Sequence, residues 1–167
     1  MALNAYLRLK GQTQGEIKGS VIQKGREDSI MVIAVSHEIV SPRDAASGLP
    51  SGKRMHKPLV ITKELDKSSP LLLNVLTNNE NIIDLTIDFW TPQITAARGA
   101  GSEVQHYSIR LTNANIASIN FRMPNNKHPE LMKFAEYEEV AFTYEKIEWT
   151  WTDGGIMAAD SWVAPNV

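Results

Sequence analysis

The sequence predicts a mainly β domain, an antiparallel barrel or sandwich of two sheets with one short α-helix. Segments in which apolar and polar residues alternate recur along the chain, and this period of two is typical of half-buried strands. Turn-rich stretches separate these segments, and one segment alone has a helix start signal. A chain of 167 residues without an evident linker or repeat is expected to fold as one domain, residues 1–167.

Three strands are expected before the helix. Residues 3–10 alternate strictly between apolar and polar side chains. Residues 30–40 read IMVIAVSHEIV, apolar on both faces at first and polar on one side later, which predicts one strand. Residues 59–62 form a third, shorter strand, and the long stretch before it, residues 41–57, is expected to be an extended loop.

The helix is expected over residues 69–78. The sequence DKSSP precedes LLLNVLTNN, and a serine followed by proline is typical of a helix N-terminus. Serine can cap the first turn, and proline fits the first helical position. The Asn pair ends the helix after barely three turns.

The remaining strands follow the helix. Residues 83–90 alternate most cleanly, and residues 106–112 and 116–123 are separated by a bend in the asparagine-rich stretch 113–115. In residues 140–151, Val140, Phe142 and Tyr144 share one parity, whereas Ile147, Trp149 and Trp151 share the other. A change of parity within one strand predicts a bulge or a second apolar surface that needs covering.

Composition excludes several classes of protein. The net charge of −2 argues against a dedicated nucleic-acid binder, which usually has a basic excess. No apolar run approaches 18 residues, so membrane insertion is not expected. The first residues lack the pattern of a cleavable signal peptide, so synthesis in the cytoplasm and export by another route are expected. Disulfides and thiolate metal sites are excluded because the chain has no cysteine.

The glycine-rich stretch SGLPSGKRMHKP at residues 47–58 invites comparison with a phosphate-binding loop. That motif needs four residues between its glycines and a hydroxyl residue after the lysine, and a helix must follow. Here three residues separate Gly48 from Gly52, Arg54 replaces the hydroxyl residue, and Pro50 removes one backbone amide. A strand is expected to follow. We therefore interpret the stretch as an exposed hairpin loop and expect no nucleotide cofactor.

No catalytic or metal constellation is evident, and we predict that the protein is not an enzyme. His37-Glu38 begins like a zinc-protease motif, but Ser41 stands where the second histidine belongs. A metal bridge between His37 and His106 stays an open, less favoured alternative to structural roles. The acidic run with Glu136, Glu138 and Glu139 is expected to be solvated.

Several runs of the chain closely resemble one family. They are LRLKGQTQG, GREDSIMV, SHEIVSPRDAASGLPSGKRMHKPLVITKELDKSSPLLLNVLTNNE, QHYSIRLTNANIASIN and EEVAFTYEKIEWTW. These runs are similar to the Hcp family, the hemolysin-coregulated proteins of the inner tube of bacterial type VI secretion systems. The resemblance covers almost the whole chain; only the C-terminal segment, residues 153–167, has no recognised counterpart.

The resemblance implies a structural, self-assembling subunit. It implies a homohexameric ring with a wide channel, stacked into a tube that a contractile sheath propels, tipped by a VgrG-type spike protein. It implies that effectors travel in the channel, and that the protein is cytoplasmic before firing and secreted afterwards. An alternative that the tryptophans leave open is a stand-alone β-barrel that binds carbohydrate or single-stranded nucleic acid.

Two sets of residues are predicted to make contacts in such a tube. The loop at residues 41–57 exceeds the length at which loops usually have a function, so we expect it to contact neighbouring rings or subunits. The predicted contact residues are Arg43, Asp44, Lys53, Arg54, His56, Tyr144, Trp149 and Trp151. Ser36 and Glu38, on the polar face of their strand, are predicted to line the channel and touch cargo.

Overall fold

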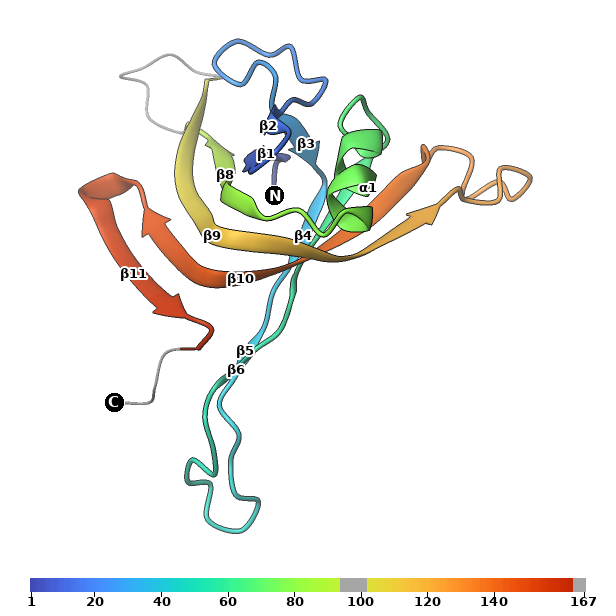
Figure 1. Ribbon diagram of the computed structural model, residues 1–167. Helices are drawn as coiled ribbons and strands as arrows, with labels where there is room; N and C mark the ends of the chain where they lie inside the picture. The colour runs from blue at the N-terminus through green and yellow to red at the C-terminus, as the bar shows by residue number, and fades with distance from the viewer. Residues whose placement is uncertain (94–101, 164–167) are drawn as a thin grey trace.

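The computed structural model describes residues 1–93 and 102–163 and contains one strongly curved antiparallel sheet (Figure 1). Its nine strands follow the hydrogen-bonded order β2-β1-β8-β9-β10-β7-β4, with β3 paired to β1 and β11 paired to β10. This path does not close into a barrel. Its curvature folds the sheet over one core, so the sandwich form of the predicted mainly β fold is the one observed.

The strands and the helix have the following bounds. In chain order they are β1 (Ala5–Gly11), β2 (Gly15–Ile17), β3 (Ile30–Val32), β4 (Ala34–Ser36), β5 (Ile39–Val40), β6 (Met55–His56), β7 (Leu59–Glu64), α1 (Ser69–Thr77), β8 (Ile82–Pro92), β9 (Glu103–Arg122), β10 (Tyr137–Trp151) and β11 (Ile156–Ser161). The short 3₁₀ turn Asp153–Gly155 joins β10 to β11. The helix matches the prediction within one residue, and the C-terminal segment, for which no counterpart was recognised, supplies β11.

The prediction of one strand over residues 30–40 is wrong. The stretch is divided into β3, β4 and β5, and each piece has a different partner: β1, β7 and β6 respectively. Residues 30–36 therefore connect the two ends of the curved sheet. An apolar run indicates that both faces of a strand are covered by other elements. It does not reveal that successive parts of the run pair with different strands.

The long pair β9 and β10 changes its buried face midway. The buried residues on either side of this point are Leu111 and Ala114 on β9 and Ile147 and Tyr144 on β10. Asn113 lies between them with φ +50°, and its Nδ2 donates to Glu145 Oε2 at 2.8 Å. The bend predicted at residues 113–115 and the parity change predicted in the last strand are thus one corner shared by both strands. A β-bulge in the same pair, opposite residues 141–142, adds to the curvature.

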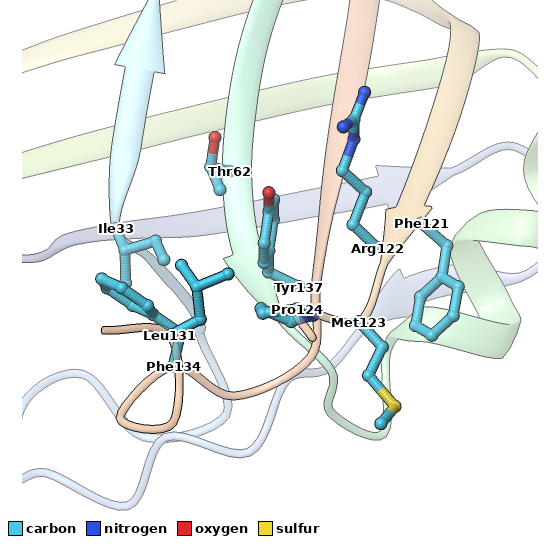
Figure 2. A pocket seen from close by; sticks show the side chains of 9 residues that line it. All are labelled: Ile33, Thr62, Phe121, Arg122, Met123, Pro124, Leu131, Phe134 and Tyr137. Atoms are coloured by element: carbon cyan, nitrogen blue, oxygen red, sulfur yellow. The ribbon is translucent and has the colours of Figure 1, made fainter. Parts of the chain in front are cut away.

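The connection from β9 to β10 bears a shallow apolar groove at one end of the strand pair (Figure 2). Successive backbone turns shape this connection: the amide of Leu131 donates to the carbonyl of His128 at 2.9 Å, and that of Phe134 donates to Leu131 at 3.1 Å. These turns place Leu131 and Phe134 near Ile33, which lies between β3 and β4.

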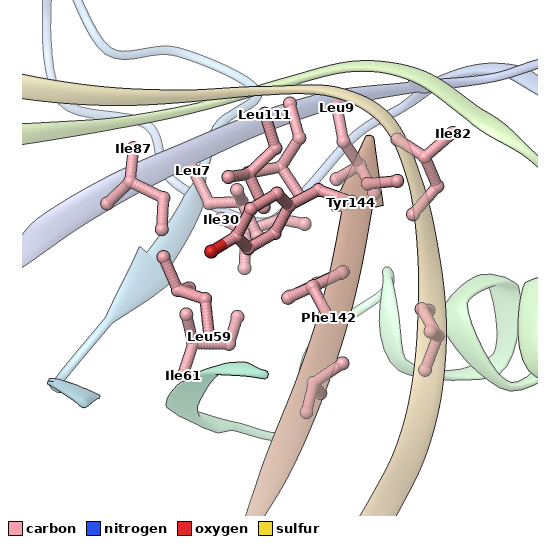
Figure 3. Packing of buried hydrophobic residues seen from close by; sticks show 14 of the residues in the cluster. Leu7, Leu9, Ile30, Leu59, Ile61, Ile82, Ile87, Leu111, Phe142 and Tyr144 are labelled. Atoms are coloured by element: carbon pink, nitrogen blue, oxygen red, sulfur yellow. The ribbon is translucent and has the colours of Figure 1, made fainter. Parts of the chain in front are cut away.

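The core lies inside the curve of the sheet, where side chains from both halves meet the helix (Figure 3). Its fully buried members include Leu7, Ile30, Ile61, Leu85, Leu111 and Phe142. From α1, Leu72 and Val75 complete the cluster, because positions three apart share one face of a helix. Burial of these side chains supplies most of the favourable free energy of folding.

The helix N-terminus differs from the expected serine cap. Ser68 occupies the N-cap position, but its side chain makes no capping hydrogen bond to the helix. Its hydroxyl instead donates to Asp66 Oδ1, which also accepts from the Ser68 amide at 2.9 Å. The aspartate two residues upstream therefore organises the first turn, while Pro70 lies in that turn as predicted.

A buried ion pair ties this helix end to the sheet. Lys63 on β7 is fully buried, and its Nζ lies 2.7 Å from Glu138 Oε1 on β10 and 3.0 Å from Asp66 Oδ1. Its third partner is Ser69 Oγ at 3.0 Å. The prediction that Glu138 is solvated is therefore wrong: alternation along β10 turns it inward, away from its neighbours in the acidic run.

Candidate functional site

A two-stranded arm projects from the body of the molecule (Figure 1). We define the arm as residues 39–56, the β5–β6 pair and the loop between them. It extends well beyond the curved sheet, on the side opposite β1 and β2. It contains most of the predicted 41–57 loop, and its last strand, β6, lies within that predicted range.

The outer part of the arm is an ordered hairpin. Arg43 and Pro50 form an antiparallel bridge, and the Gly48 amide donates to the Asp44 carbonyl at 2.8 Å. The Asp44 carboxylate accepts from the Ser47 hydroxyl at 2.7 Å, and this hydrogen bond lowers the pKa of Asp44. Gly48 has φ +73°, where glycine is favoured. The hairpin therefore uses these amides in its own internal hydrogen bonds.

Ionic contacts attach the base of the arm to β11. Arg54 donates from Nε and Nη2 to the two carboxylate oxygens of Asp160, at 2.5 and 2.7 Å. His56 Nε2 contacts the same carboxylate at 2.8 Å. The Arg54 guanidinium, followed in effect by His56, lowers the pKa of Asp160 to about 2. A bidentate Arg–carboxylate pair also fixes orientation, so this contact sets the direction of the arm.

A chain of hydrogen bonds continues from His56 into the body. His56 Nδ1 lies 2.7 Å from the Tyr144 hydroxyl, which lies 2.8 Å from His37 Nε2. If His56 donates from Nε2 to Asp160, its Nδ1 accepts from Tyr144, whose oxygen accepts from His37; all groups are then satisfied with both rings neutral. Trp162 stacks on His56 with ring centroids 5.6 Å apart. We call Arg54, His56, Tyr144, Asp160 and His37 the base cluster.

The base cluster gives the arm a pH dependence. Burial, and then the nearby His56, lower the pKa of His37 below its usual value of 6.5. The folded state thus favours neutral His37, and stability falls as pH drops below about 6.5, where the unfolded chain gains a proton first. The depressed pKa of Asp160 has the same sign: its contribution is present above about pH 4 and is lost toward pH 2.

We therefore expect amide hydrogen exchange at the base of the arm, in β5 and β6, to speed up between pH 7 and pH 5 after correction for intrinsic rates. Exchange in the core strand β8 should not change over this range. His37→Gln, which keeps a polar group but cannot titrate, is the control and should flatten the change. An identical profile in wild type and variant would contradict the role given to His37.

The structure places the predicted contact residues in three groups. The predicted residues Arg54, His56 and Tyr144 come together in the base cluster, and Lys53 Nζ donates to the Val163 carbonyl at 3.1 Å. Arg43 and Asp44 lie on the exposed outer hairpin. Trp149 and Trp151 lie further along β10, where Trp149 packs on the core and Trp151 packs edge-on against His106. Ser36 is exposed on β4, and Glu38 pairs with Lys57 at 2.9 Å.

Sequence reasoning missed Asp160 and the partnership of His37 with Tyr144. More than a hundred residues separate Asp160 from both Arg54 and His56, and it lies in the C-terminal segment that had no recognised counterpart. The one available signal in the sequence was the apolar pair Ile156 and Met157 shortly before Asp160. Two apolar residues are too short a pattern to predict a strand or the residues that it contacts.

The open alternative of a metal bridge between His37 and His106 is not realised. His37 bonds to Tyr144, whereas His106 is on β9 and packs against Trp151. Across residues 1–93 and 102–163, no group of three or more His, Cys, Asp or Glu side chains is arranged to hold a metal ion. No helix in this described part of the chain is long and apolar enough to cross a membrane.

Comparisons with known proteins agree with this architecture. A family model described as "Type VI secretion system effector, Hcp" matches residues 6–151. A "Major exported protein" of Pseudomonas aeruginosa is 40% identical over 174 residues, covering 99% of this chain and 98% of the relative. The crystal structure of an Hcp protein superposes with a TM-score of 0.87 at 31% identity, covering 97% of this chain and 99% of the other.

A further solved structure, the secreted protein Hcp3 from Pseudomonas aeruginosa, has a TM-score of 0.76 and 33% identity, covering 96% of this chain and 99% of the other. The family is one of structural secretion proteins rather than of enzymes. The match of the family model over most of the chain agrees with the full-length similarity to the exported relative. The chain therefore belongs to the Hcp family of type VI secretion system proteins.

Proposed function

We propose that this chain is a self-assembling subunit that forms homohexameric rings, stacks them into the inner tube and is secreted with effectors in its channel. Its further partners in this proposal are a VgrG-type spike protein and a contractile sheath. It resides in the cytoplasm before firing and leaves the cell afterwards. The observation that carries the proposal is the arm, which projects from the body and is fixed at its base.

A fixed projection of this kind suits contact between copies. A hairpin that served the monomer alone would gain by folding back on the body, because its exposed apolar side chains would then be buried. The arm instead exposes Ile39, Leu49 and Met55, while the base cluster holds it in one direction. An exposed element that is already ordered and fixed in direction loses little further conformational entropy when it binds a partner.

Within the proposal, the predicted contact residues divide into two roles. Arg43 and Asp44 lie on the outer arm, whereas Lys53 lies nearer the base, where its Nζ donates to the Val163 carbonyl. All three are proposed to contact the next ring or subunit. Arg54, His56 and Tyr144 are proposed to act through the base cluster by orienting the arm. Trp149 and Trp151 are kept as candidate subunit contacts on the β10 side.

Electron microscopy of the purified protein tests the proposal directly. We expect rings of six subunits with a central hole, together with short stacks at high concentration. Multi-angle light scattering on the same sample should give a mass close to six times that of one 18.6 kDa chain. A protein that stays monomeric at high concentration would overturn the ring proposal and favour a stand-alone binding domain.

The binding-domain alternative has less support. A platform for bases or sugars needs aromatic faces that are open to the ligand. Trp149 packs on the core, and Trp151 has one side occupied by His106. Asp88, on β8 in the same sheet, adds negative charge that would repel the phosphates of a nucleic acid, whereas Asp84 is paired with Arg110.

The channel wall gives a separate prediction. Ser36 is exposed on β4, and its small polar side chain suits a surface that must release cargo. We expect Ser36→Glu to leave the ring intact but to lower the steady-state level of an effector that depends on encapsulation, because a charge at the contact costs desolvation. Immunoblotting of the effector beside wild type and Ser36→Ala, the size-matched control, measures this. Equal effector levels in all three proteins would contradict the prediction that Ser36 lines the channel.

A further inference from the structure

The apolar groove at the end of β9 and β10 is large and uncovered (Figure 2). It has a volume of about 670 Å³, and its apolar lining consists mainly of Ile33, Phe121, Met123, Leu131 and Phe134. Phe121 and Phe134 are 57% and 55% exposed. Exposed aromatic side chains around a hollow are typical of an interaction site, since a lone subunit gains nothing by leaving them in water.

The opposite end of the same strand pair has an exposed apolar edge. β10 begins at the groove with Tyr137 and ends at Trp151, where Gly154 and Gly155, both at positive φ, form the turn into β11. On β11, Ile156 and Met157 are 68% and 61% exposed. Among the described strands, β11 pairs with β10 alone, and the arm contacts it at its far end, at Asp160 and Ser161. The β9–β10 connection, which bears the groove, and the β10–β11 turn lie on opposite sides of the molecule in Figure 1.

The charges at the two ends are complementary. Residues 121–136 have three cationic and two acidic side chains, a net charge of +1. In residues 148–161, Glu148 and Asp160 are paired with Lys146 and Arg54, and Asp153 is the remaining carboxylate. Among the ion pairs of the described residues, none involves Arg122 or Lys127 beside the groove, nor Asp153 in the β10–β11 turn. Such charges favour one orientation of approach.

We propose that the groove receives the β10–β11 hairpin of the next copy of this chain, with Ile156 and Met157 seated against Phe121 and Phe134. The inference rests on the proposed ring and names its lateral contact. Each copy then presents a groove at one end and a hairpin at the other, and such a head-to-tail contact closes into a ring when the rotation between copies allows it.

The arm also has exposed apolar side chains, but it suits the groove less well. Figure 1 shows the arm leaving the body across the direction in which the β9–β10 pair runs, whereas the hairpin lies at the end of that pair.

The absence of cysteine allows a direct cross-linking test, because any introduced thiol is unique. We expect Phe134→Cys/Met157→Cys, treated with a short bismaleimide, to form covalent species up to six chains on a denaturing gel. Each single variant should give no product beyond a dimer. Phe134→Cys/Ser47→Cys, with the second thiol at the arm, is the matched control and should not give this series.

The outcomes separate this inference from the ring proposal. Rings in micrographs without the Phe134–Met157 product would overturn the lateral contact and leave the ring. Cross-linking through Ser47 instead would assign the groove to the arm, and absence of both rings and products would overturn the ring proposal itself. As a second measurement, Phe134→Asp should abolish rings while retaining the thermal transition of a folded chain, whereas Ile22→Asp, which changes an exposed side chain away from the groove, should keep them.

Discussion

Replacement of Lys63 by methionine is expected to lower the free energy of unfolding by about 3–5 kcal/mol, among the largest effects of any single substitution in this chain. Methionine fills most of the space of the lysine stem, so the loss comes from charge rather than from a cavity. Without Nζ, the carboxylate of Glu138 is left buried and unpaired, and Asp66 loses a partner at 3.0 Å. Burial of an unpaired charge is far more costly than burial of a pair.

Urea denaturation followed by circular dichroism measures this change. All samples must have the same protein concentration, because self-association adds a concentration-dependent contribution to stability. The double variant Lys63→Met/Glu138→Leu should recover a large part of the loss, since an apolar pair of similar volume avoids the unpaired charge. If the double variant loses the full sum of the two single losses, the two side chains are not coupled as the structure indicates.

An exposed ion pair provides the control. Lys57 and Glu38 lie 2.9 Å apart, yet both side chains are more than half exposed. Lys57→Met should change stability by less than about 1 kcal/mol, because solvent screens such pairs. A large loss of stability in Lys57→Met would mean that the loss measured for Lys63→Met does not come from the burial of its ion pair.

The strand pattern and the helix were predictable because each depends on residues close in sequence. Alternation indicated β1 and β8, the SSP signal placed the start of α1, and the parity change in residues 140–151 indicated the corner near Asn113. The division of residues 30–40 into three strands was not predictable, since it depends on which distant strand each piece meets.

The same limit explains the ion pair and the base cluster. Glu138 stands in an acidic run that looks solvated, and only its position on β10 beside β7 brings it to Lys63, 75 residues away. Arg54 and His56 were recognised as candidate residues, but as contacts to other copies. Their partner Asp160 follows from the pairing of β10 with β11. The sequence singled out the loop at residues 41–57 as a candidate contact element, and the tertiary contacts indicate how it is oriented.

Deletion of residues 45–52 is expected to leave the ring intact and to lower tube formation and secretion by at least about tenfold, which corresponds to a weakening of the association between rings by about 1.4 kcal/mol. The deletion removes the outer hairpin but retains β5, β6 and the whole base cluster. Joining Asp44 to Lys53 leaves a six-residue connection between Val40 and Met55, and connections of this length are common between paired strands.

The comparison needs two readouts on the same preparation. Light scattering counts subunits in the ring, and electron microscopy measures the lengths of stacks, while an immunoblot of culture supernatant measures secretion. Leu49→Ala, which keeps the hairpin but shortens its exposed apolar side chain, is the graded control and should shorten stacks less than the deletion. Wild-type stack lengths in the deletion variant would show that the arm does not join rings, and loss of the ring itself would assign the arm to contacts within one ring.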